Sequence, residues 1–322
     1  MSNAIETERL QKRFGENRAL DELNLTIRGG SVYGLLGPNG AGKTTAIRVL
    51  TTLLKPSGGK ATVLGHDVER EAASVRQKVS LTGQYASVDE DLTGHENLVL
   101  VSRLLGMSWG EARERATELL SAFGLSEAAR KQVRTFSGGM RRRIDIAASL
   151  VTRPEILFLD EPTTGLDPRS RNQVWELVRQ IAADGTTVLL TTQYLEEADR
   201  LAERMAVIDH GRVIAEGTSH ELKSSIGGNA LRFQLADPAR RDEARELVSR
   251  IVGDTVLPNT DPTAISVKVA SASVAAEVLS ALCNARIQLT DFSLGAPSLD
   301  DVFFTLTGRP PELPAAEKEQ AT

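Results

Sequence analysis

The segment from Gly37 to Thr45 constrains the fold of this chain more than any other part of the sequence. It reads Gly-Pro-Asn-Gly-Ala-Gly-Lys-Thr-Thr, it follows an apolar run at Val32–Leu36, and a helical pattern continues from Thr44 to about Leu54. Glycines let the backbone wrap closely around an anion, and the N–H groups at the start of a helix attract it. A glycine-rich loop between a strand and a helix therefore predicts a phosphate-binding loop on an α/β sheet.

The last residues of this loop predict which phosphate compound it binds. Lys43 adds a positive charge that can bridge the β- and γ-phosphates of ATP, and the Thr44 hydroxyl can ligate Mg²⁺. We therefore predict ATP and Mg²⁺ as ligands. The positions expected to contact the nucleotide are Gly37, Pro38, Asn39, Gly40, Ala41, Gly42, Lys43, Thr44 and Thr45.

A second apolar run ends in two carboxylates. Ile156–Leu159 has the continuous hydrophobic character of a strand buried on both faces of a parallel sheet, and Asp160 and Glu161 follow it directly. Side chains after such a strand lie at the carboxyl edge of the sheet, where ligands bind. We predict that Asp160 holds Mg²⁺ through water. Glu161 would point to the opposite side if strand geometry continues, and would polarise the attacking water. The alternative is that both acids only cap the following turn.

The segment Ser137-Gly138-Gly139 precedes a strong helical pattern. Ser137 is a suitable N-cap and the two glycines allow close approach, so the segment predicts a second helix N-terminus suited to an anion. An ordinary capped helix is the alternative. The arginines that follow, Arg141–Arg143, predict a solvated face that attracts phosphate or an acidic partner, and we assign no chemistry to them.

The composition excludes some partners and compartments. The chain has 322 residues, 41% of them hydrophobic, and a formal charge of -5, so no basic bias indicates nucleic acid as a partner. No apolar run reaches the roughly 20 residues that a membrane-spanning helix needs. The single cysteine, Cys283, lies in an apolar helical pattern and is predicted to be buried. We therefore expect a reducing compartment, and a separate chain for any membrane part.

Strand and helix patterns divide the chain into predicted domains. Residues 1–226 alternate strands and helices, which is typical of an α/β sheet, with a helical insert at about 92–153. Glycine-rich chain interrupts the periodicity before 229, and residues 229–308 show the order βαββαβ of a small ferredoxin-like α+β sandwich. A disordered tail is predicted for 309–322, because Pro, Ala, Glu and Lys dominate it.

From about Ile5 to Ser225 the sequence resembles the ATP-binding subunits of ABC transporters. The loop at Gly37–Thr45 matches Walker A, Ser137–Gly139 matches the core of the ABC signature, and Ile156–Glu161 matches Walker B. The resemblance implies a P-loop NTPase fold of the ABC ATPase type, with a mixed sheet and a helical subdomain. It also implies three more site residues, which are Gln84 of the Q-loop near ATP and Mg²⁺, Asp167 of the D-loop, and Phe14 stacked on adenine. For Phe14, local core packing is the alternative.

The resemblance narrows to drug-export ATPases of the daunorubicin/doxorubicin-resistance type, through Thr191–Asp199, the late Asp300–Phe303 and the C-terminal extension. Two positions depart from the common family pattern. Met140 stands where glutamine is common, and Gln193 stands where a switch histidine is common. Glutamine can hydrogen-bond a γ-phosphate but cannot take up a proton near neutral pH. Glu161 is therefore the expected base, with Lys43 and the positioning residue Gln193 completing the catalytic set; a plain surface position is the alternative for Gln193.

In this family one chain's Walker A loop and another chain's signature enclose one ATP. The single set of motifs here implies an ATP-dependent homodimer, or a pair with a homologous chain, in which Ser137, Gly138 and Gly139 act in trans. The implied function is ATP hydrolysis at the cytoplasmic face of the cell membrane, energising export of a hydrophobic, anthracycline-like drug or antibiotic through a separate permease. The alternatives are a soluble ABC ATPase not coupled to transport and a P-loop kinase or metabolic enzyme.

Overall fold

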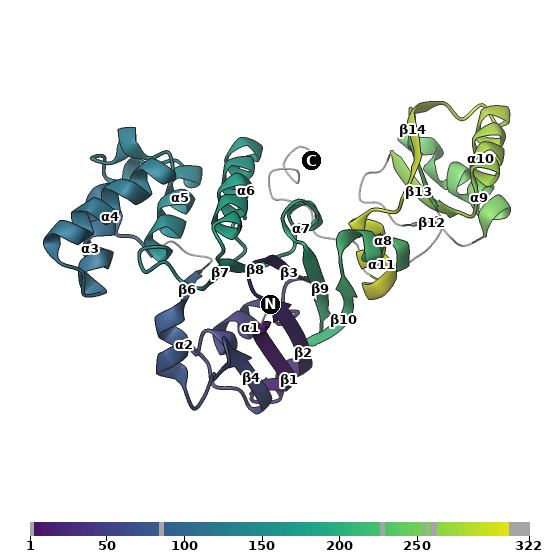
Figure 1. The fold of residues 1–322 in the computed structure, drawn as a ribbon. Helices are drawn as coiled ribbons and strands as arrows, with labels where there is room; N and C mark the ends of the chain where they lie inside the picture. The colour runs from purple at the N-terminus through teal and green to yellow at the C-terminus, as the bar shows by residue number, and fades with distance from the viewer. Residues whose placement is uncertain (1–2, 84–86, 226–228, 254–255, 258–262, 309–322) are drawn as a thin grey trace. The chain divides into compact units, whose positions relative to one another are not determined.

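The computed structural model describes residues 3–83, 87–225, 229–253, 256–257 and 263–308. These residues form two compact units, which divide between Ile214 and Ala215. Each unit has its own hydrophobic core, and each is described by itself below (Figure 1). The tail predicted at 309–322 lies outside the described residues.

The first unit contains a sheet with the strand order β10-β9-β3-β8-β7-β6. From β9 to β6 all neighbouring strands run parallel, and every residue of β3, β7 and β8 is buried, as expected for strands covered on both faces. Because β3 and β7 both pair with β8, the segments that follow them start at one edge of the sheet. The strand bounds are β3 Val32–Leu36, β6 Val79–Thr82, β7 Ile156–Asp160, β8 Thr187–Thr192, β9 Arg204–Asp209 and β10 Arg212–Gly217.

A second sheet of this unit is antiparallel and has the order β2-β1-β4-β5. Its strands are β1 Asn3–Phe14, β2 Asn17–Arg28, β4 Gly58–Val63 and β5 His66–Asp67. The sequence patterns do not predict β1, because charged residues occupy much of it and register shifts break its alternation. Buried side chains of this sheet, such as Ile5 and Leu10, share one core with Ile47 and Leu50 of helix α1. This packing anchors the helix that follows the predicted phosphate-binding loop.

The helices of the first unit cover the parallel sheet and form the predicted helical insert (Figure 1). Helix α1 spans Lys43–Leu50, so it ends before the predicted Leu54. In the insert, α3 and α4 each begin with a capping box, at Thr93 with Glu96 and at Ser108 with Glu111. The remaining bounds are α2 Ala72–Lys78, α3 Gly94–Leu104, α4 Trp109–Ala122, α5 Gly138–Ser149, α6 Pro168–Ala183 and α7 Leu195–Leu201, with 3₁₀ turns at Ser126–Ala128 and Val133–Thr135.

The second unit confirms the predicted ferredoxin-like order. Its antiparallel sheet has the strand order β12-β13-β11-β14, and buried side chains of α9 and α10 pack on one face of it. The predicted burial of Cys283 on α10 is wrong, because its side chain is exposed. The bounds are α8 Ser219–Ser225, β11 Asn229–Leu235, α9 Arg241–Val252, β12 Val256–Leu257, β13 Ala264–Val269, α10 Ala272–Asn284, β14 Leu289–Gly295 and α11 Leu299–Thr307, with a 3₁₀ turn at Pro238–Arg240.

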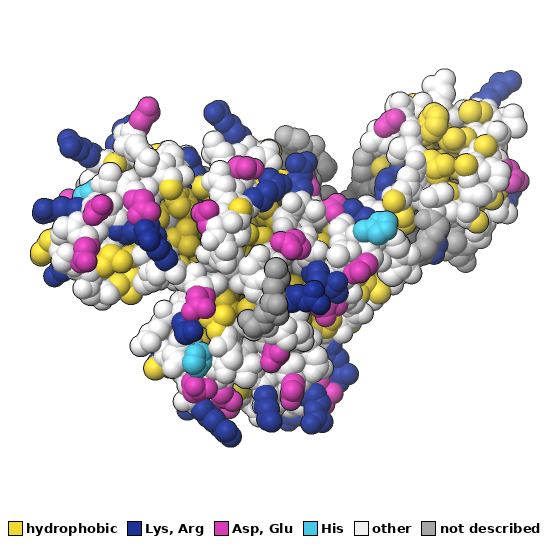
Figure 2. Space-filling model, in the orientation of Figure 1, with side chains coloured by type: hydrophobic (Ala, Val, Ile, Leu, Met, Phe, Trp, Pro, Cys, Tyr) yellow, Lys and Arg dark blue, Asp and Glu magenta, His cyan; other side chains and the backbone are white. Residues whose placement is uncertain are grey.

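The surface mixes both signs of charge. On the face shown in Figure 2, Lys and Arg side chains lie interspersed with Asp and Glu side chains rather than in one basic stripe. Among the residues that the structure describes, no helix is both long and apolar enough to cross a membrane.

Candidate functional site

The loop after β3 is shaped by close backbone approaches that only glycine allows. A Cβ atom at Gly37 would lie 2.3 Å from the carbonyl oxygen of Ile208, and one at Gly42 would lie 2.4 Å from that of Ala19. Gly42 also has a φ of 108°, in the left-handed region, and directly precedes α1. The chain can therefore fold back over the start of α1, with the backbone N–H groups of the loop gathered at the helix N-terminus.

The Lys43 ammonium lies across this loop and is almost fully buried. Its Nζ donates to the carbonyl oxygens of Gly37, at 2.7 Å, and Pro38, at 3.1 Å. The same Nζ lies 3.6 Å from Oε1 of Glu161. The predicted phosphate-binding lysine and the predicted base therefore form an ion pair in this structure.

Asp160, the last residue of β7, is held by two hydroxyl groups. Its Oδ1 accepts hydrogen bonds from Thr44 Oγ1 at 3.1 Å and from Thr191 Oγ1 at 2.6 Å. Thr191 enters the site because the parallel register of β7 and β8 pairs it directly with Asp160. Sequence reasoning missed this role of Thr191, which only the strand register reveals.

Glu161 does not continue the strand. Strand β7 ends at Asp160, and Glu161 has a φ of 48°, a left-handed backbone conformation that costs a residue with a side chain roughly 1–2 kcal/mol. Strand geometry, on which the predicted direction of the Glu161 side chain depended, therefore does not continue through Glu161. The N–H of Glu161 donates to the backbone oxygen and the hydroxyl of Thr191, both at 3.1 Å, and Thr164 Oγ1 donates to its carboxylate at 3.3 Å. These bonds fix the carboxylate beside Lys43.

A cavity of about 330 Å³ lies in front of α1, with Lys43 and Glu161 on its wall. Phe14, at the end of β1, lies on its wall with its side chain 48% exposed, and Lys12 Nζ lies 5.1 Å from the Phe14 ring centroid. Local core packing does not account for a ring this exposed. The cavity is lined by Phe14, Asn17, Ala19, Asn39, Gly40, Gly42, Lys43, Thr44, Thr45 and Glu161.

Of the two glutamines predicted to belong to the site, the structure describes Gln193 but not Gln84. Gln193 follows β8, and its Oε1 is buried without a hydrogen-bond partner among the described residues. A buried acceptor of this kind is costly unless water or a ligand supplies a donor. Gln84 lies outside the described residues, between Gly83 and Ser87.

The predicted signature segment begins helix α5. Ser137 caps the helix by accepting a hydrogen bond from the Met140 N–H at 3.3 Å, and Ser137 and Gly138 are exposed. Gly139 is buried, and a Cβ there would lie 2.4 Å from Ser170 Oγ of α6. Part of this motif is thus packed within its own chain, and part is open to a partner.

Asp167 caps helix α6 beside that contact. It accepts hydrogen bonds from the Ser170 N–H at 2.9 Å and from Ser170 Oγ at 2.6 Å, and the bonds from Ser170 lower the pKa of the Asp167 carboxyl. Ser170 therefore links the predicted D-loop to the predicted signature.

The prediction of a solvated arginine face after the signature is wrong for Arg142. Its guanidinium is buried in the first unit and donates to backbone oxygens beside Glu161. Burial lowers the pKa of Arg142, and the charges of Asp145, Glu197 and Asp160 act in the opposite direction. No local pattern separates Arg142 from its two neighbours in the sequence; a helical-wheel projection, which places it with Ile146 and Ser149, gives only a weak signal.

Sequence reasoning also missed Glu197 on α7. Its side chain is fully buried, and Oε1 accepts hydrogen bonds from Thr163 Oγ1 at 2.8 Å and Trp175 Nε1 at 3.0 Å. Burial raises the pKa of this carboxyl. Glu197 ties α7 to the turn after Glu161 and to α6.

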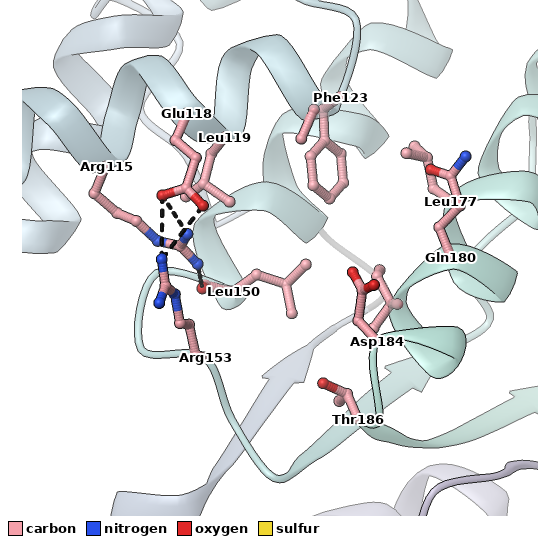
Figure 3. Close-up of a pocket in the computed structure, with 12 residues that line it drawn as sticks. Arg115, Glu118, Leu119, Phe123, Leu150, Arg153, Leu177, Gln180, Asp184 and Thr186 are labelled. Atoms are coloured by element: carbon pink, nitrogen blue, oxygen red, sulfur yellow. Dashed lines mark hydrogen bonds and ion pairs between the residues drawn. The ribbon is translucent and has the colours of Figure 1, made fainter.

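A second cavity, of about 390 Å³, lies between α4, the turn after α5 and α6 (Figure 3). Its charged side chains largely satisfy one another, since Glu118 pairs with Arg115 at 2.7 Å and with Arg153 at 3.3 Å. Arg115 also donates to the Leu150 carbonyl oxygen. No glycine-rich loop or helix N-terminus lines the cavity, so we do not assign the nucleotide to it.

A glycine-rich loop between β3 and α1, carboxylates at and just after the end of β7, and a capped Ser-Gly-Gly start of α5 together are typical of an ATP-binding cassette. The family model described as "ABC transporter" matches residues 20–164, and the model for the C-terminal domain of "ATP-binding protein DrrA1-3-like" matches residues 217–307. The chain belongs to the family of ABC transporter ATP-binding proteins that carry this DrrA-like C-terminal domain.

Known relatives span nearly the whole chain. It is 58% identical to the daunorubicin/doxorubicin resistance ATP-binding protein DrrA of Streptomyces peucetius, over 96% of this chain and 94% of that protein. It is 52% identical to the daunorubicin resistance ATP-binding protein DrrA3 of Streptomyces coeruleorubidus, over 95% and 96%. Among solved structures, a dimeric ATP-binding cassette in a post-hydrolysis state with ADP and Pi is 28% identical, with a TM-score of 0.60 over 66% of this chain and 98% of that one.

Proposed function

We propose that this chain hydrolyses ATP to energise export of a hydrophobic drug or antibiotic through a separate membrane permease. The observation that carries the proposal is the ion pair of Lys43 and Glu161 at the wall of one glycine-rich cavity, where Thr44, on the same wall, donates a hydrogen bond to Asp160. Membership in the ABC ATPase family supports the hydrolysis, and the printed names of the relatives support the export of an anthracycline-like compound. Peripheral attachment at the cytoplasmic face of the membrane is part of this proposal.

The chemistry assigned to the site is attack of water on the γ-phosphorus of ATP. The oxygen of water forms the new P–O bond, the bond from the γ-phosphorus to the β,γ-bridging oxygen breaks, and ADP leaves. Glu161 accepts the proton that the attacking water gives up. Lys43 exchanges its contact with Glu161 for the β- and γ-phosphates, which leaves the carboxylate available to the water. Gln193, with its buried Oε1, positions that water or the γ-phosphate.

Mg²⁺ fits the residues present here. The Thr44 hydroxyl and the Asp160 carboxylate are oxygen donors 3.1 Å apart, and oxygen is the ligand that Mg²⁺ prefers. Among the described residues no group of three His, Cys, Asp or Glu could hold a metal, which suits an ion bound mainly by substrate phosphates. Thr44 and Asp160, with Gln84, would hold it, and the bound ion would neutralise charge on the transferred phosphoryl group.

A second copy of the chain completes the site in our proposal. Ser137 and Gly138 are exposed at the start of α5, where helix N–H groups can bind the γ-phosphate of ATP held by another chain. Gly139 packs against Ser170, and Ser170 donates a hydrogen bond to Asp167, so these residues hold the start of α5 in place. The solved relative that is a dimer with ADP and Pi supports this arrangement.

We assign the remaining parts by the same reasoning. Phe14 stacks on adenine at the rim of the cavity. Residues 1–226 form the nucleotide-binding domain, with the helical subdomain at about 92–153 meeting the permease, and residues 229–308 form an accessory domain.

Replacing Glu161 with Gln tests the proposal. We expect the ATP dissociation constant to stay within about twofold and turnover to fall by about 10²- to 10⁴-fold, because only the proton acceptor is lost. Glu155→Gln is the matched control, since Glu155 precedes the same strand at its other end and pairs with Lys78 at the surface. Undiminished hydrolysis in the Glu161→Gln chain would contradict the assignment.

A further inference from the structure

Arg142, on helix α5, donates hydrogen bonds to the backbone on both sides of Glu161. Arg142 Nε donates to the Pro162 carbonyl oxygen at 2.7 Å, and its Nη2 donates to the Asp160 carbonyl oxygen at 3.2 Å. The side chain is 9% exposed, so these bonds are shielded from water. One planar guanidinium thus fixes the residue before and the residue after the proposed base.

The same guanidinium reaches toward the Q-loop. Arg142 Nη1 donates to the Gly83 carbonyl oxygen at 2.7 Å and lies 3.4 Å from Asp145 Oδ2. Asp145, one helical turn along α5, accepts hydrogen bonds from the N–H and the hydroxyl of Ser87 at 2.8 and 2.7 Å. Arg142 and Asp145 together therefore hold Gly83 and Ser87, the described residues on either side of Gln84 in the sequence.

Glu161 needs such an anchor. Its left-handed backbone persists only where the surroundings over-determine it, and its N–H is already held by Thr191 on the β8 side. Arg142 supplies the restraint from the opposite side, through the carbonyl groups of the two neighbouring residues. An arginine suits this task, because its guanidinium stays protonated and presents several donors in one rigid plane.

We infer that Arg142 is a positioning residue for ATP hydrolysis, which connects the signature helix to the proposed base Glu161 and to the flanks of Gln84 in the same chain. The inference rests on the proposed role of Glu161. Arg142 lies on α5 five residues after Ser137, so a shift of the signature when it meets ATP on a partner chain acts on Glu161 through this side chain. Arg142 does not line the cavity at α1, and it acts on turnover through the placement of the carboxylate.

The test compares Arg142→Gln and Arg142→Lys with the unchanged full-length chain in steady-state ATPase and equilibrium ATP-binding assays. We expect Arg142→Gln to lower kcat by about 10- to 100-fold, since small displacements of a catalytic group cost rate, while the ATP dissociation constant changes by less than about twofold. Arg142→Lys should recover only part of the rate, because one ammonium cannot span the carbonyl oxygens on both sides of Glu161.

Arg143→Gln is the matched control. Arg143 lies on the same helix and donates to the Phe123 carbonyl oxygen within the helical insert, away from Glu161. The Arg143→Gln chain should keep a normal kcat. A loss of kcat in Arg142→Gln alone then reflects the position of Glu161, and not the general effect of removing an arginine from α5. If Arg142→Gln fails to fold, Arg142→Lys carries the test alone, and normal kcat in the folded lysine variant would overturn the inference.

The dependence on Glu161 is tested in a double variant. If Arg142 acts through Glu161, Arg142→Gln should cause no further loss in the single-turnover rate of a Glu161→Gln chain. The same fold-loss in both backgrounds would overturn the inference and leave the base assignment intact. Full hydrolysis by Glu161→Gln alone would instead overturn the proposed function, so the two failures are distinguishable.

Discussion

Two helix N-termini in the first unit carry glycine-containing motifs, and they are built in opposite ways. At α1, Gly37 and Gly42 pack against the chain's own backbone, Lys43 and Glu161 line the cavity in front of the helix, and Asp160 accepts a hydrogen bond from Thr44 on its wall. At α5, Ser137 and Gly138 are exposed, and only Gly139 is packed. The first terminus has charged side chains in place around its cavity, whereas the second offers exposed helix N–H groups without such side chains. This difference is the basis of our proposal that α5 completes a site on another molecule.

Removing the cation at the first terminus should have the largest effect. In Lys43→Ala the γ-phosphate loses its charge partner, so we expect ATPase activity to fall by about 10³-fold or more and ATP affinity by about 10- to 100-fold. Isothermal titration with ATP and a phosphate-release assay measure the two changes. Retained turnover in this variant would show that the cavity at α1 is not the hydrolysis site.

Alanine substitutions at the two signature glycines should change the stability of the chain by different amounts, because only Gly139 is packed within the chain. Gly139→Ala forces Ser170 aside and should lower the free energy of unfolding by about 1–3 kcal/mol, as overpacking does. At Gly138 a Cβ would lie 3.6 Å from Leu166, which is an ordinary contact. The free energy of unfolding of Gly138→Ala should therefore lie within about 0.5 kcal/mol of that of the unchanged chain. Urea unfolding monitored by circular dichroism measures both. Equal destabilisation of the two variants would contradict the difference in packing.

Gln193, the residue after β8, has a buried side-chain oxygen that no described residue satisfies. Gln193→Ala removes a buried acceptor that no described group satisfies, and we expect kcat to fall by about tenfold with little change in stability. The measurement is steady-state ATPase activity alongside thermal unfolding. An unchanged rate would make Gln193 a bystander.

Glu197 should produce a smaller effect that depends on pH. Burial raises the pKa of this carboxyl in the folded chain, so the folded state holds its proton more tightly than the unfolded state. The stability that protonated Glu197 contributes is therefore fully present below its ordinary value of 4.5 and is lost as pH rises through the raised pKa. The free energy of unfolding of the unchanged chain, minus that of Glu197→Gln, should fall as the pH rises above 4.5. A pH-independent difference would contradict this assignment.

The comparison also shows which parts of the site a sequence can predict. Gly37–Thr45 and the acids of Ile156–Glu161 form contiguous motifs, in which the local order of residues already implies the geometry. Thr191 and Arg142 join the site only through the register of β7 with β8 and the packing of α5. Only a weak helical-wheel signal separates Arg142 from the arginines beside it, so its burial could not be predicted before the fold was known.

The sequence predicted the strands of the second unit more completely than those of the first. The order βαββαβ predicted the sheet of the second unit, because each of its elements has a clear period. In the first unit β1 escaped prediction, since its charged residues and shifted register hide the alternation of Ile5, Thr7 and Leu10. Glu161 departs from the strand that precedes it, because its backbone turns at Asp160 to bring the carboxylate to Lys43.

Sedimentation of the Glu161→Gln chain with and without saturating Mg-ATP tests most directly whether α5 of one copy completes the site at α1 of another. We expect a monomer without nucleotide and a dimer with it, because ATP that is not hydrolysed holds both halves together. Adding Gly138→Asp, which places a negative charge at the exposed helix start, should abolish the dimer while ATP binding persists. A chain that stays monomeric with saturating ATP, or a Gly138→Asp variant that dimerises equally well, would contradict the proposal that α5 of one copy completes the site at α1 of another.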